Sequence, residues 1–522
     1  MLTLANFALA IQNVFQPDIL LAMLVGSMIG VVVGALPGAS ATMALAVMIP
    51  VTFWFEADMS LLLLISVYCS GVFGGSISAC LLNIPGTPAS AATCFDGAPL
   101  TKRGEGGKAI LTALIASTFG GLISGIALLF CAPLLAALAL KFGAPETMMV
   151  ALFGLTMVAS LSSDKLVKGL IMGALGMLIG TIGLSPTGSA RFTFGSIQLY
   201  GGLQTVPILI GVFSIPEVIR MLASHGWKMD TSKKSRMRMA FKEIKSIIPT
   251  CSIATLVGLI IGLIPAIGPE TATFIGYDRA KKMAKEDGET FGKGNIKGVA
   301  ASEAANNAVC GTSLAPMFAL GIPGSGAAMV LMGGLMIHGL TPGPTLFREQ
   351  MPLLTTLFFG FIIAQVFMLV VGFGACKLAP LVFKVHHLVL APIILVVCMV
   401  GTFATNNSLF DVYIMLAFGV AAYFLGNAGY SCVPMVLGML LGKQFETNLS
   451  RTIVLSQKTG FLSFIMTRPI ALVLAGLTII TIILPVIMEQ RKKKRLARIA
   501  LEAVGENKQG AQDMNLQNNA DC

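Results

Sequence analysis

Long apolar runs, separated by short polar or charged segments, recur along the whole chain. Runs such as residues 110–129, 353–371 and 469–488 are long enough to cross a bilayer, which takes about 20 helical residues. We expect crossings near residues 60–83, 109–130, 145–161, 166–184 and 200–222, near 299–337, 353–376, 387–404, 410–425 and 430–442, and at 469–488. The pattern predicts an all-α polytopic membrane protein with about 11 or 12 transmembrane helices.

Composition supports a protein that lies in a membrane. The 522 residues are 55% hydrophobic and only 11% charged, whereas soluble proteins carry about a quarter charged residues. The net charge of +11 comes from short basic clusters between apolar runs, which is typical of cytoplasmic loops rather than of a nucleic-acid surface. The ten cysteines are scattered and form no CxxC pair, so we expect buried thiols rather than disulfides or metal ligands.

Four segments combine proline and glycine with small hydroxyl residues inside apolar runs. They are Gly34–Thr42 and Asn83–Ser90 in the first half, and Gly262–Thr271 and Gly321–Gly326 in the second half. Proline removes a backbone donor and glycine relaxes the backbone, so each run is expected to be a helix that breaks at membrane depth. Paired broken helices in two halves of a chain indicate the binding site of a secondary transporter.

Landmarks in the two halves recur in the same order. Pro37 matches Pro265 with an offset of 228 residues (265 − 37), and Pro85 matches Pro323 with an offset of 238 (323 − 85). Two Met- and Pro-centred landmarks follow with offsets of 243 (415 − 172) and 227 (434 − 207). This order predicts an internal repeat, with a loop insertion in the polar stretch 278–297.

Charge predicts how the two repeats are oriented. Between its two broken segments the first half is acidic around residues 56–58, and it becomes basic over 102–108. The second half reverses this order, because 279–297 is basic and 340–352 is nearly neutral. Basic loops face the cytoplasm, so the halves are expected to lie upside down relative to each other, as inverted repeats do in transporters.

These patterns divide the chain into five parts. Residues 17–54 and 247–278 are expected to be re-entrant helical hairpins with the break at the tip, and 443–468 is placed outside the membrane. The expected parts are a first transmembrane repeat over 1–227, a basic cytoplasmic linker over 228–246, a second inverted repeat over 247–468, an extra helix over 469–490 and a disordered cytoplasmic tail over 491–522.

Several contiguous blocks together resemble the TctA family, the large membrane subunit of the tripartite tricarboxylate transporters. The blocks are Leu36–Thr42, Ile84–Thr93, Lys102–Lys108, Glu303–Asn307, Leu320–Ser325 and His338–Phe347, and the likeness extends over about residues 15 to 490. The resemblance implies a bacterial inner-membrane carrier that works with a small four-helix membrane subunit and a periplasmic solute-binding protein. It also implies cation-coupled uptake of carboxylates such as citrate, without a cofactor and with Na⁺ or H⁺ as the coupling ion.

The broken helices also carry the expected carboxylate site. A half-helix N-terminus offers free N–H groups and a positive dipole end, and glycine lets a solute approach the backbone. The expected substrate-binding residues are Pro37, Gly38, Ser40, Thr42, Pro85, Gly86, Thr87, Ser90, Pro323, Gly324, Ser325 and Gly326. The alternative is that the breaks only shape helix packing.

Coupling is expected at the second pair of breaks. Glu270 stands beside a Gly-Pro break where the first half has only small residues, so it either binds a cation, carries a proton or is an interfacial carboxylate. Oxygen ligands suit Na⁺, and the expected coupling set is Glu270, Thr271, Thr273, Asn306 and Asn307. Other polar residues are weaker candidates: Glu303, Asp96, Glu146 and Glu217 near predicted helix ends, the interfacial His338, His386 and His387, and the outer-loop Arg191.

Other function classes fit the sequence less well. The chain has no phosphate-binding Gly-x-x-x-x-Gly-Lys-Ser/Thr motif, so a nucleotide-driven pump is not expected. Motifs of intramembrane enzymes, such as His-Glu-x-x-His, are also missing from the sequence. An intramembrane enzyme and a channel remain the alternatives, and paired inverted hairpins favour alternating access over a static pore.

Overall fold

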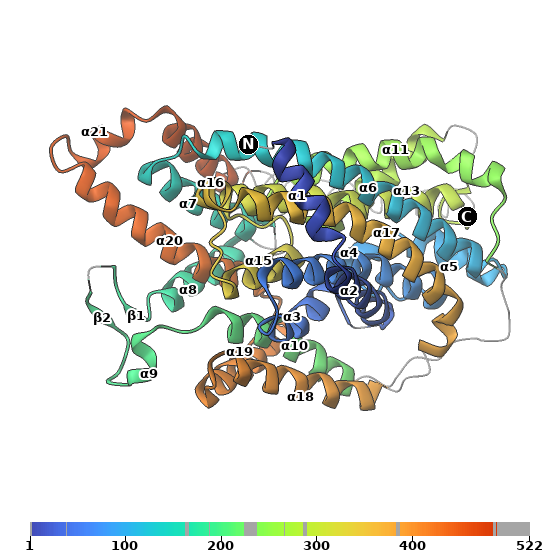
Figure 1. The fold of residues 1–522 in the computed structure, drawn as a ribbon, viewed down its shortest axis with the longest axis horizontal. Coiled ribbons are helices and arrows are strands. Elements are labelled where there is room, and N and C mark those ends of the chain that lie inside the picture. The colour runs from blue at the N-terminus through green and yellow to red at the C-terminus, as the bar shows by residue number, and fades with distance from the viewer. Residues whose placement is uncertain are drawn as a thin grey trace, which may run out of the picture.

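The computed structural model describes residues 3–37, 39–161, 166–186, 188–223, 237–265, 267–284, 290–382, 387–483 and 487. It is a bundle of helices (Figure 1). Among the described residues the only strands are β1 (Gly183–Leu184) and β2 (Ala190–Arg191), which pair in an antiparallel hairpin. Eight described helices are long and apolar enough to cross a membrane, which confirms the all-α polytopic membrane fold.

The helices of the first half are α1 (Leu4–Val14), α2 (Pro17–Ala35), α3 (Ala41–Thr52), α4 (Ala57–Leu82), the 3₁₀ turn η1 (Pro88–Ser90), α5 (Cys94–Lys102), α6 (Gly106–Ala139), α7 (Ala144–Leu161), α8 (Leu166–Gly180), α9 (Ile197–Tyr200) and α10 (Thr205–Ala223). Those of the second half are α11 (Phe241–Leu263), α12 (Gly268–Met283), α13 (Ile296–Thr312), α14 (Leu314–Leu320), α15 (Gly326–Ile337), α16 (Pro344–Glu349), α17 (Met351–Val382), α18 (His387–Asn406), α19 (Leu409–Asn427), α20 (Val433–Leu455) and α21 (Phe461–Met466). A further helix spans Pro469–Ile483.

The predicted breaks separate these helices. Leu36–Ser40 separates α2 from α3, and Ile264–Ile267 separates α11 from α12. Ser40 begins α3 because its hydroxyl accepts the Met43 N–H, and Ser325 begins α15 by accepting the Ala328 N–H. Such N-caps satisfy a donor that the first turn leaves free.

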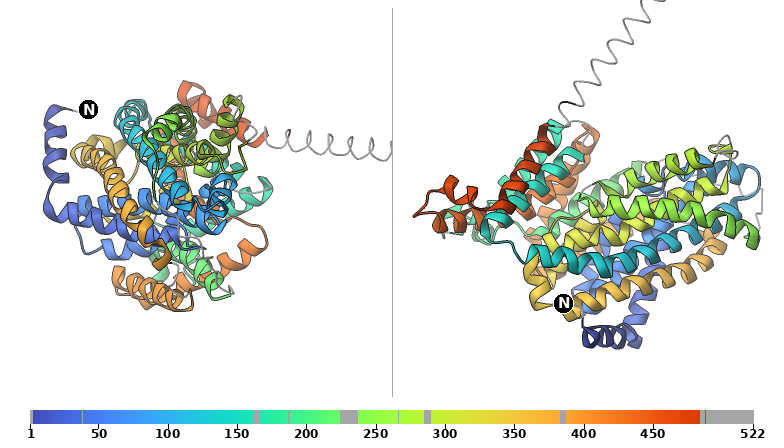
Figure 2. Two further views of the ribbon diagram at one scale, coloured as in Figure 1. Left: turned by 90° about the vertical axis from the view of Figure 1, so that its right-hand side faces the viewer. Right: turned by 90° about the horizontal axis from the view of Figure 1, so that it is seen from above.

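Three differences from the sequence prediction change the architecture. The crossing expected at 299–337 is divided into α13, α14 and α15, because Gly321 adopts the left-handed conformation (φ +71°) and ends α14. The crossing expected at 430–442 is only the first part of the 23-residue helix α20. Helix α1 was not predicted; it lies at the edge of the bundle (Figure 2), where Phe7 packs edge-on against Phe359 of α17.

Two close contacts between helices occur at positions that are related by the offsets of the sequence repeat. A side chain added at Gly30 of α2 would come within 2.6 Å of the Val67 carbonyl oxygen of α4. One added at Gly258 of α11 would come within 2.4 Å of the Ala305 carbonyl oxygen of α13. The glycines differ by 228 (258 − 30) and the carbonyls by 238 (305 − 67), so the same contact occurs twice. Glycine is required because any Cβ would overlap the facing backbone.

Helices of one half also pack against helices of the other half in matching pairs. Helix α10 packs along α19, and α20 packs along α8. Likewise α4 packs along α17, and α13 packs along α6. The glycines again mark the contacts, since Gly211 of α10 faces the Met415 carbonyl and Gly438 of α20 faces the Gly173 carbonyl.

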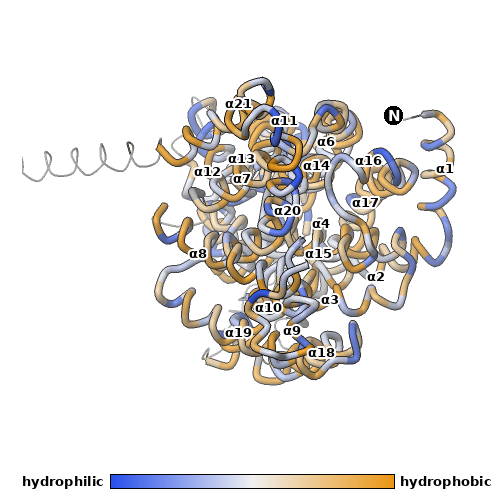
Figure 3. Tube along the Cα trace, turned by 90° about the vertical axis from the view of Figure 1, so that its left-hand side faces the viewer, coloured by the Kyte–Doolittle hydropathy of each residue, from blue (hydrophilic) through white to orange (hydrophobic). Residues whose placement is uncertain are grey.

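Most of the helical trace is hydrophobic (Figure 3).

Candidate functional site

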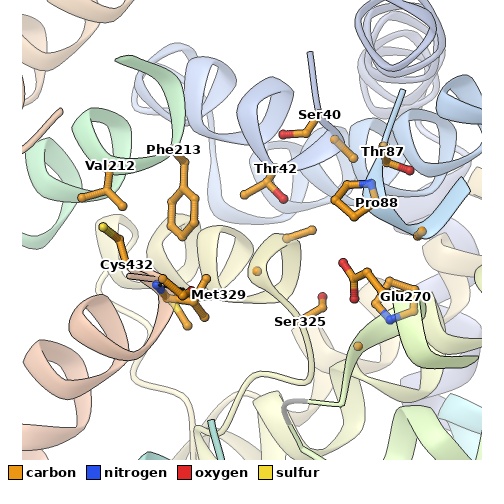
Figure 4. Close-up of a pocket in the computed structure, with 18 of the residues that line it drawn as sticks. Ser40, Thr42, Thr87, Pro88, Val212, Phe213, Glu270, Ser325, Met329 and Cys432 are labelled. Atoms are coloured by element: carbon orange, nitrogen blue, oxygen red, sulfur yellow. Dashed lines mark hydrogen bonds between the residues drawn. The ribbon is translucent and has the colours of Figure 1, made fainter. Parts of the chain in front are cut away.

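A cavity of about 590 Å³ lies where broken segments of both halves meet (Figure 4). Its lining includes six of the predicted substrate-binding residues: Ser40, Thr42, Thr87, Pro323, Ser325 and Gly326. Glu270 and Thr271 of the predicted coupling set also line it. The fold therefore brings together segments that are almost 300 residues apart in the sequence.

Two helix N-termini meet at this cavity. Helix α3 begins after Ser40 and α15 begins after Ser325, and each serine caps its helix by accepting a backbone N–H at 3.1 Å. A side chain added at Gly326 would lie 3.8 Å from the Thr42 hydroxyl oxygen, so the two first turns are close. Both ends carry partial positive charge and free N–H groups. The arrangement can hold an anion between two helices.

The remaining predicted substrate-binding residues do not line the cavity. Pro37, Gly86, Ser90 and Gly324 are buried in packing, and Pro85 is exposed elsewhere. A side chain at Gly86 would come within 2.5 Å of the Gly34 carbonyl, and one at Gly324 within 2.6 Å of Ser313 Cβ. These two glycines allow close helix packing. Gly38 lies outside the described residues.

Sequence reasoning missed Tyr68 and Arg220 as residues of the cavity wall. The Tyr68 hydroxyl lies 3.3 Å from Ser325 Oγ. Arg220 Nη1 pairs with Glu217 Oε1 at 2.6 Å, and about half of the arginine side chain is exposed. The available signal was the Glu217–Arg220 pair itself, because these are the two charged residues of the otherwise apolar α10. From the sequence, Glu217 is a weaker candidate near a predicted helix end, whereas Arg220 is not named as a candidate.

Glu270 stands in the first turn of α12, and its carboxylate points into the cavity (Figure 4). None of the ion pairs formed by the described residues includes it. A carboxylate suits a helix N-terminus, where the dipole stabilises negative charge. Thr271 and Thr273 donate their hydroxyls to the carbonyls of Ile267 and Glu270. These two threonines therefore support the turn that holds Glu270.

Asn306 and Asn307 do not line the cavity and lie in the interior of the bundle. Both are fully buried on α13, and neither side-chain amide has a hydrogen-bond partner among the described residues. Glu303, one turn before them, is fully buried as well and stands in the middle of α13. Its expected place near a helix end was wrong, because α13 begins at Ile296. Buried polar groups normally have a hydrogen-bond partner, and the described residues supply none to the side chains of Asn306 and Asn307.

Three of the other weaker candidates, Asp96, Glu146 and Arg191, have structural partners. Asp96 is fully buried and accepts several backbone N–H bonds, and Glu146 accepts the Gly143 N–H at 2.8 Å. Arg191 pairs with Glu446 at 2.8 Å, and that hydrogen-bonded carboxylate raises the pKa of the guanidinium. His338 ends α15 and is half-buried. Side-chain placement of His387, and all of His386, lie outside the described residues.

The described ranges contain no group of three His, Cys, Asp or Glu side chains that could hold a metal ion. The nine cysteines described are free, so none of them is in a disulfide. The chemistry of the cavity is therefore that of hydroxyls, helix N-termini, one arginine and two carboxylates. This set can recognise the charge of a small solute.

Comparison with known proteins gives a family. The chain is 33% identical over 495 residues to an uncharacterized 52.8 kDa protein in the TAR-I ttuC' 3' region of Agrobacterium vitis, covering 94% of this chain and 98% of that one. It is 31% identical over 237 residues to an uncharacterized protein in the TAR-II ttuC' 3' region of the same organism, covering 45% and 97%. No solved structure matches the chain. The model of the tripartite tricarboxylate transporter TctA family matches residues 20–437, and the chain belongs to that family.

Proposed function

We propose that this chain is the carrier subunit that takes up a tricarboxylate or related carboxylate by cation symport. In this proposal it works in a bacterial inner membrane with a small four-helix subunit and a periplasmic solute-binding protein that delivers the solute. Family membership makes it a component of a tricarboxylate transporter. The observation that carries the finer proposal is the cavity between the N-termini of α3 and α15.

The cavity suits an anion with several carboxylates. Its volume of about 590 Å³ is within the range of roughly 300–1,000 Å³ common for small-molecule sites. One carboxylate binds at the first turns of α3 and α15, where backbone N–H groups and the hydroxyls of Thr42 and Tyr68 are available. A second carboxylate takes the place of Glu217 on Arg220, because guanidinium and carboxylate form the stronger, charge-assisted hydrogen bonds.

Glu270 supplies a reason for coupling. Its negative charge lies in the same cavity as the proposed anion site, so it repels the solute until a cation neutralises it. Moving a trianion into a negative interior costs about 7 kcal/mol at 100 mV, at about 2.3 kcal/mol per charge. Cotransported Na⁺ or H⁺ offsets this cost. The other proposed coupling residues are Thr271 and Thr273 at the same turn, and the buried Asn306 and Asn307.

The two halves act as inverted repeats in this proposal. One support is that the contact of Gly30 with Val67 and that of Gly258 with Ala305 are related by the offsets of the sequence repeat. A second support is that equivalent helices of the two halves pack against each other in pairs. Alternating access then follows from the relative movement of the halves around the cavity. The inverted topology is tested by labelling from the periplasmic side, which should modify Ala57→Cys and spare Lys233→Cys. Labelling of both from one side would contradict it.

The transport test uses all three subunits in proteoliposomes with a panel of labelled carboxylates. Arg220→Gln should lower the uptake rate at limiting solute about tenfold or more, since a charge-assisted hydrogen bond contributes about 1.5–3 kcal/mol. The double variant Glu217→Gln/Arg220→Gln removes the stranded acid and should remain equally impaired. Arg348→Gln, at an exposed ion pair on α16, is the matched control and should transport normally.

Counterflow separates a carrier from a channel. Unlabelled carboxylate inside the vesicles should drive transient accumulation of labelled solute, because a carrier exchanges one bound solute for another. Equilibration without accumulation would contradict the carrier. Unchanged uptake by Arg220→Gln and by the double variant Glu217→Gln/Arg220→Gln would show that the cavity is not the solute site.

A further inference from the structure

We propose that Glu303 forms a second, separate cation site, buried beside the solute cavity and built from hydroxyl oxygens. The charge it takes is a single positive one, carried by Na⁺ or by H⁺. The inference rests on the proposed symport for its physiological role. Its own evidence is a fully buried carboxyl group that forms no ion pair with any described residue.

Hydroxyl groups surround the Glu303 carboxylate. Thr93 Oγ1 donates to Oε1, and Ser117 Oγ of α6 donates to Oε2 at 3.0 Å. Ser302 Oγ lies 3.0 Å from Thr93 Oγ1. The Ser76 hydroxyl of α4 also lies beside the carboxylate. It forms no hydrogen bond with any described residue. Carboxylate and hydroxyl oxygens are the ligands that a hard cation prefers.

No positive charge of the described chain reaches this carboxylate. None of the ion pairs among the described residues contains Glu303. The titratable groups that face it are the thiols of Cys80, Cys94 and Cys310, which add no positive charge. A buried carboxylate at membrane depth requires a cation, a proton or water. Glu303 is fully buried, so bulk water does not solvate it, and a cation or a proton is what neutralises its charge.

A second observation points to a ligand at the same place. Asn307 follows Glu303 by one helical turn and so lies on the same face of α13. Its side-chain amide is fully buried and has no partner among the described residues. This face of α13 packs on α6, because Ser117 contacts Glu303 and Ser124, seven residues on, donates to the Asn307 carbonyl. The unpaired amide oxygen can complete the ligand set after a side-chain rotation.

The site is connected to the solute cavity through one short segment. Thr93 follows η1, and the residues Thr87, Pro88 and Ala89 at the start of that segment line the cavity. A cation bound at Glu303 attracts the Thr93 hydroxyl oxygen and fixes the segment against α13. Binding therefore positions Thr87 at the cavity wall. In this way cation and solute sites are coupled without sharing a ligand.

Cation binding is measured on the purified chain without any carboxylate. Binding of Na⁺ is measured with radioactive ²²Na⁺ at fixed pH. Binding of H⁺ is measured in Na⁺-free buffer from the protons that the protein releases to an indicator dye during a pH titration. Glu303→Gln should lower the affinity for Na⁺ about 100-fold, or remove the released proton altogether if H⁺ is the ligand. Ser117→Ala should lower the affinity for Na⁺ about tenfold, or raise the affinity for H⁺, because Ser117 donates to the ionised carboxylate. Glu349→Gln, an exposed acid on α16, is the matched control with wild-type binding. Ser117→Ala keeps the test valid if Glu303→Gln does not fold.

Wild-type binding of both cations by Glu303→Gln would overturn the site, and so would a wild-type protein that binds neither. The two proposals fail separately. Cation binding that depends on Glu303 in a protein that takes up no carboxylate supports this site and contradicts the symport. Carboxylate uptake by the wild type, together with unaltered cation binding in Glu303→Gln, supports the symport and contradicts this site.

Discussion

Asp96 and Glu303 are two fully buried carboxylates whose surroundings differ. Asp96 of α5 accepts N–H bonds from Gly292, Gly294 and Asn295 at 2.7–2.9 Å and the Tyr277 hydroxyl at 2.8 Å. The donors to Glu303 among the described residues are side-chain hydroxyls. Backbone donors are fixed, whereas hydroxyls rotate and can turn an oxygen toward a cation.

The loop around Asp96 is built for one anion. Gly292 and Gly294 adopt positive φ angles of +82° and +101°, a conformation that glycine adopts without strain. These turns direct successive N–H groups at one point, which makes an anion-binding nest. Asp96 fills that nest from the other half of the chain and joins the two halves. The comparison teaches that burial alone does not mark an exchangeable site; the kind of donor does.

The largest expected effect comes from emptying the nest. Asp96→Ala leaves three backbone N–H groups and one hydroxyl without their acceptor, and each buried unpaired group costs about 1–3 kcal/mol. The free energy of unfolding in detergent should fall by about 3 kcal/mol or more. Asp278→Ala, at an exposed ion pair on α12, is the control and should change stability by less than about 0.5 kcal/mol. A similar small change in Asp96→Ala would contradict the structural role.

A single donor to the same carboxylate should matter less. Tyr277→Phe removes the hydroxyl that donates to Asp96 Oδ2 and keeps the ring, which packs against Phe95 and Phe291. The three backbone donors remain in place, so the loss should be about 1 kcal/mol. Denaturant unfolding of Tyr277→Phe beside the Asp96→Ala protein measures the difference. A loss equal to that of Asp96→Ala would mean that the nest depends on the tyrosine.

How far the sequence predicts these features depends on the range of the signal. Ser40 and Ser325 are predictable because a helix start after a Pro-Gly break is local. The Glu217–Arg220 pair is a local signal of charge on α10, but the sequence does not show that this pair faces the cavity. Tyr68 reaches the cavity only through packing between distant helices, so no local pattern identifies it. The Glu303 site is of this second kind, since Thr93 and Ser117 lie about 200 residues away in the sequence. The break after α14 was visible as a motif, but its effect on the crossing was missed.

The smallest effect on stability is expected at Glu303. Glutamine keeps the shape and one accepting oxygen for Thr93 and Ser117, and it removes a buried charge that the described chain does not pair. Without the coupling cation, Glu303→Gln should therefore unfold within about 1 kcal/mol of the wild type. This contrasts with the loss expected at Asp96, although both carboxylates are fully buried.

The coupling cation should change the stability of the wild type and of Glu303→Gln differently. At ten times the dissociation constant a bound ligand stabilises the native state by about 1.4 kcal/mol, so adding the coupling cation should stabilise the wild type and leave Glu303→Gln unchanged. Unfolding curves in Na⁺ and in choline at constant ionic strength, repeated over a pH series, measure this for Na⁺ and for H⁺. A glutamine variant as unstable as Asp96→Ala in every buffer would mean that Glu303 serves the fold, as Asp96 does.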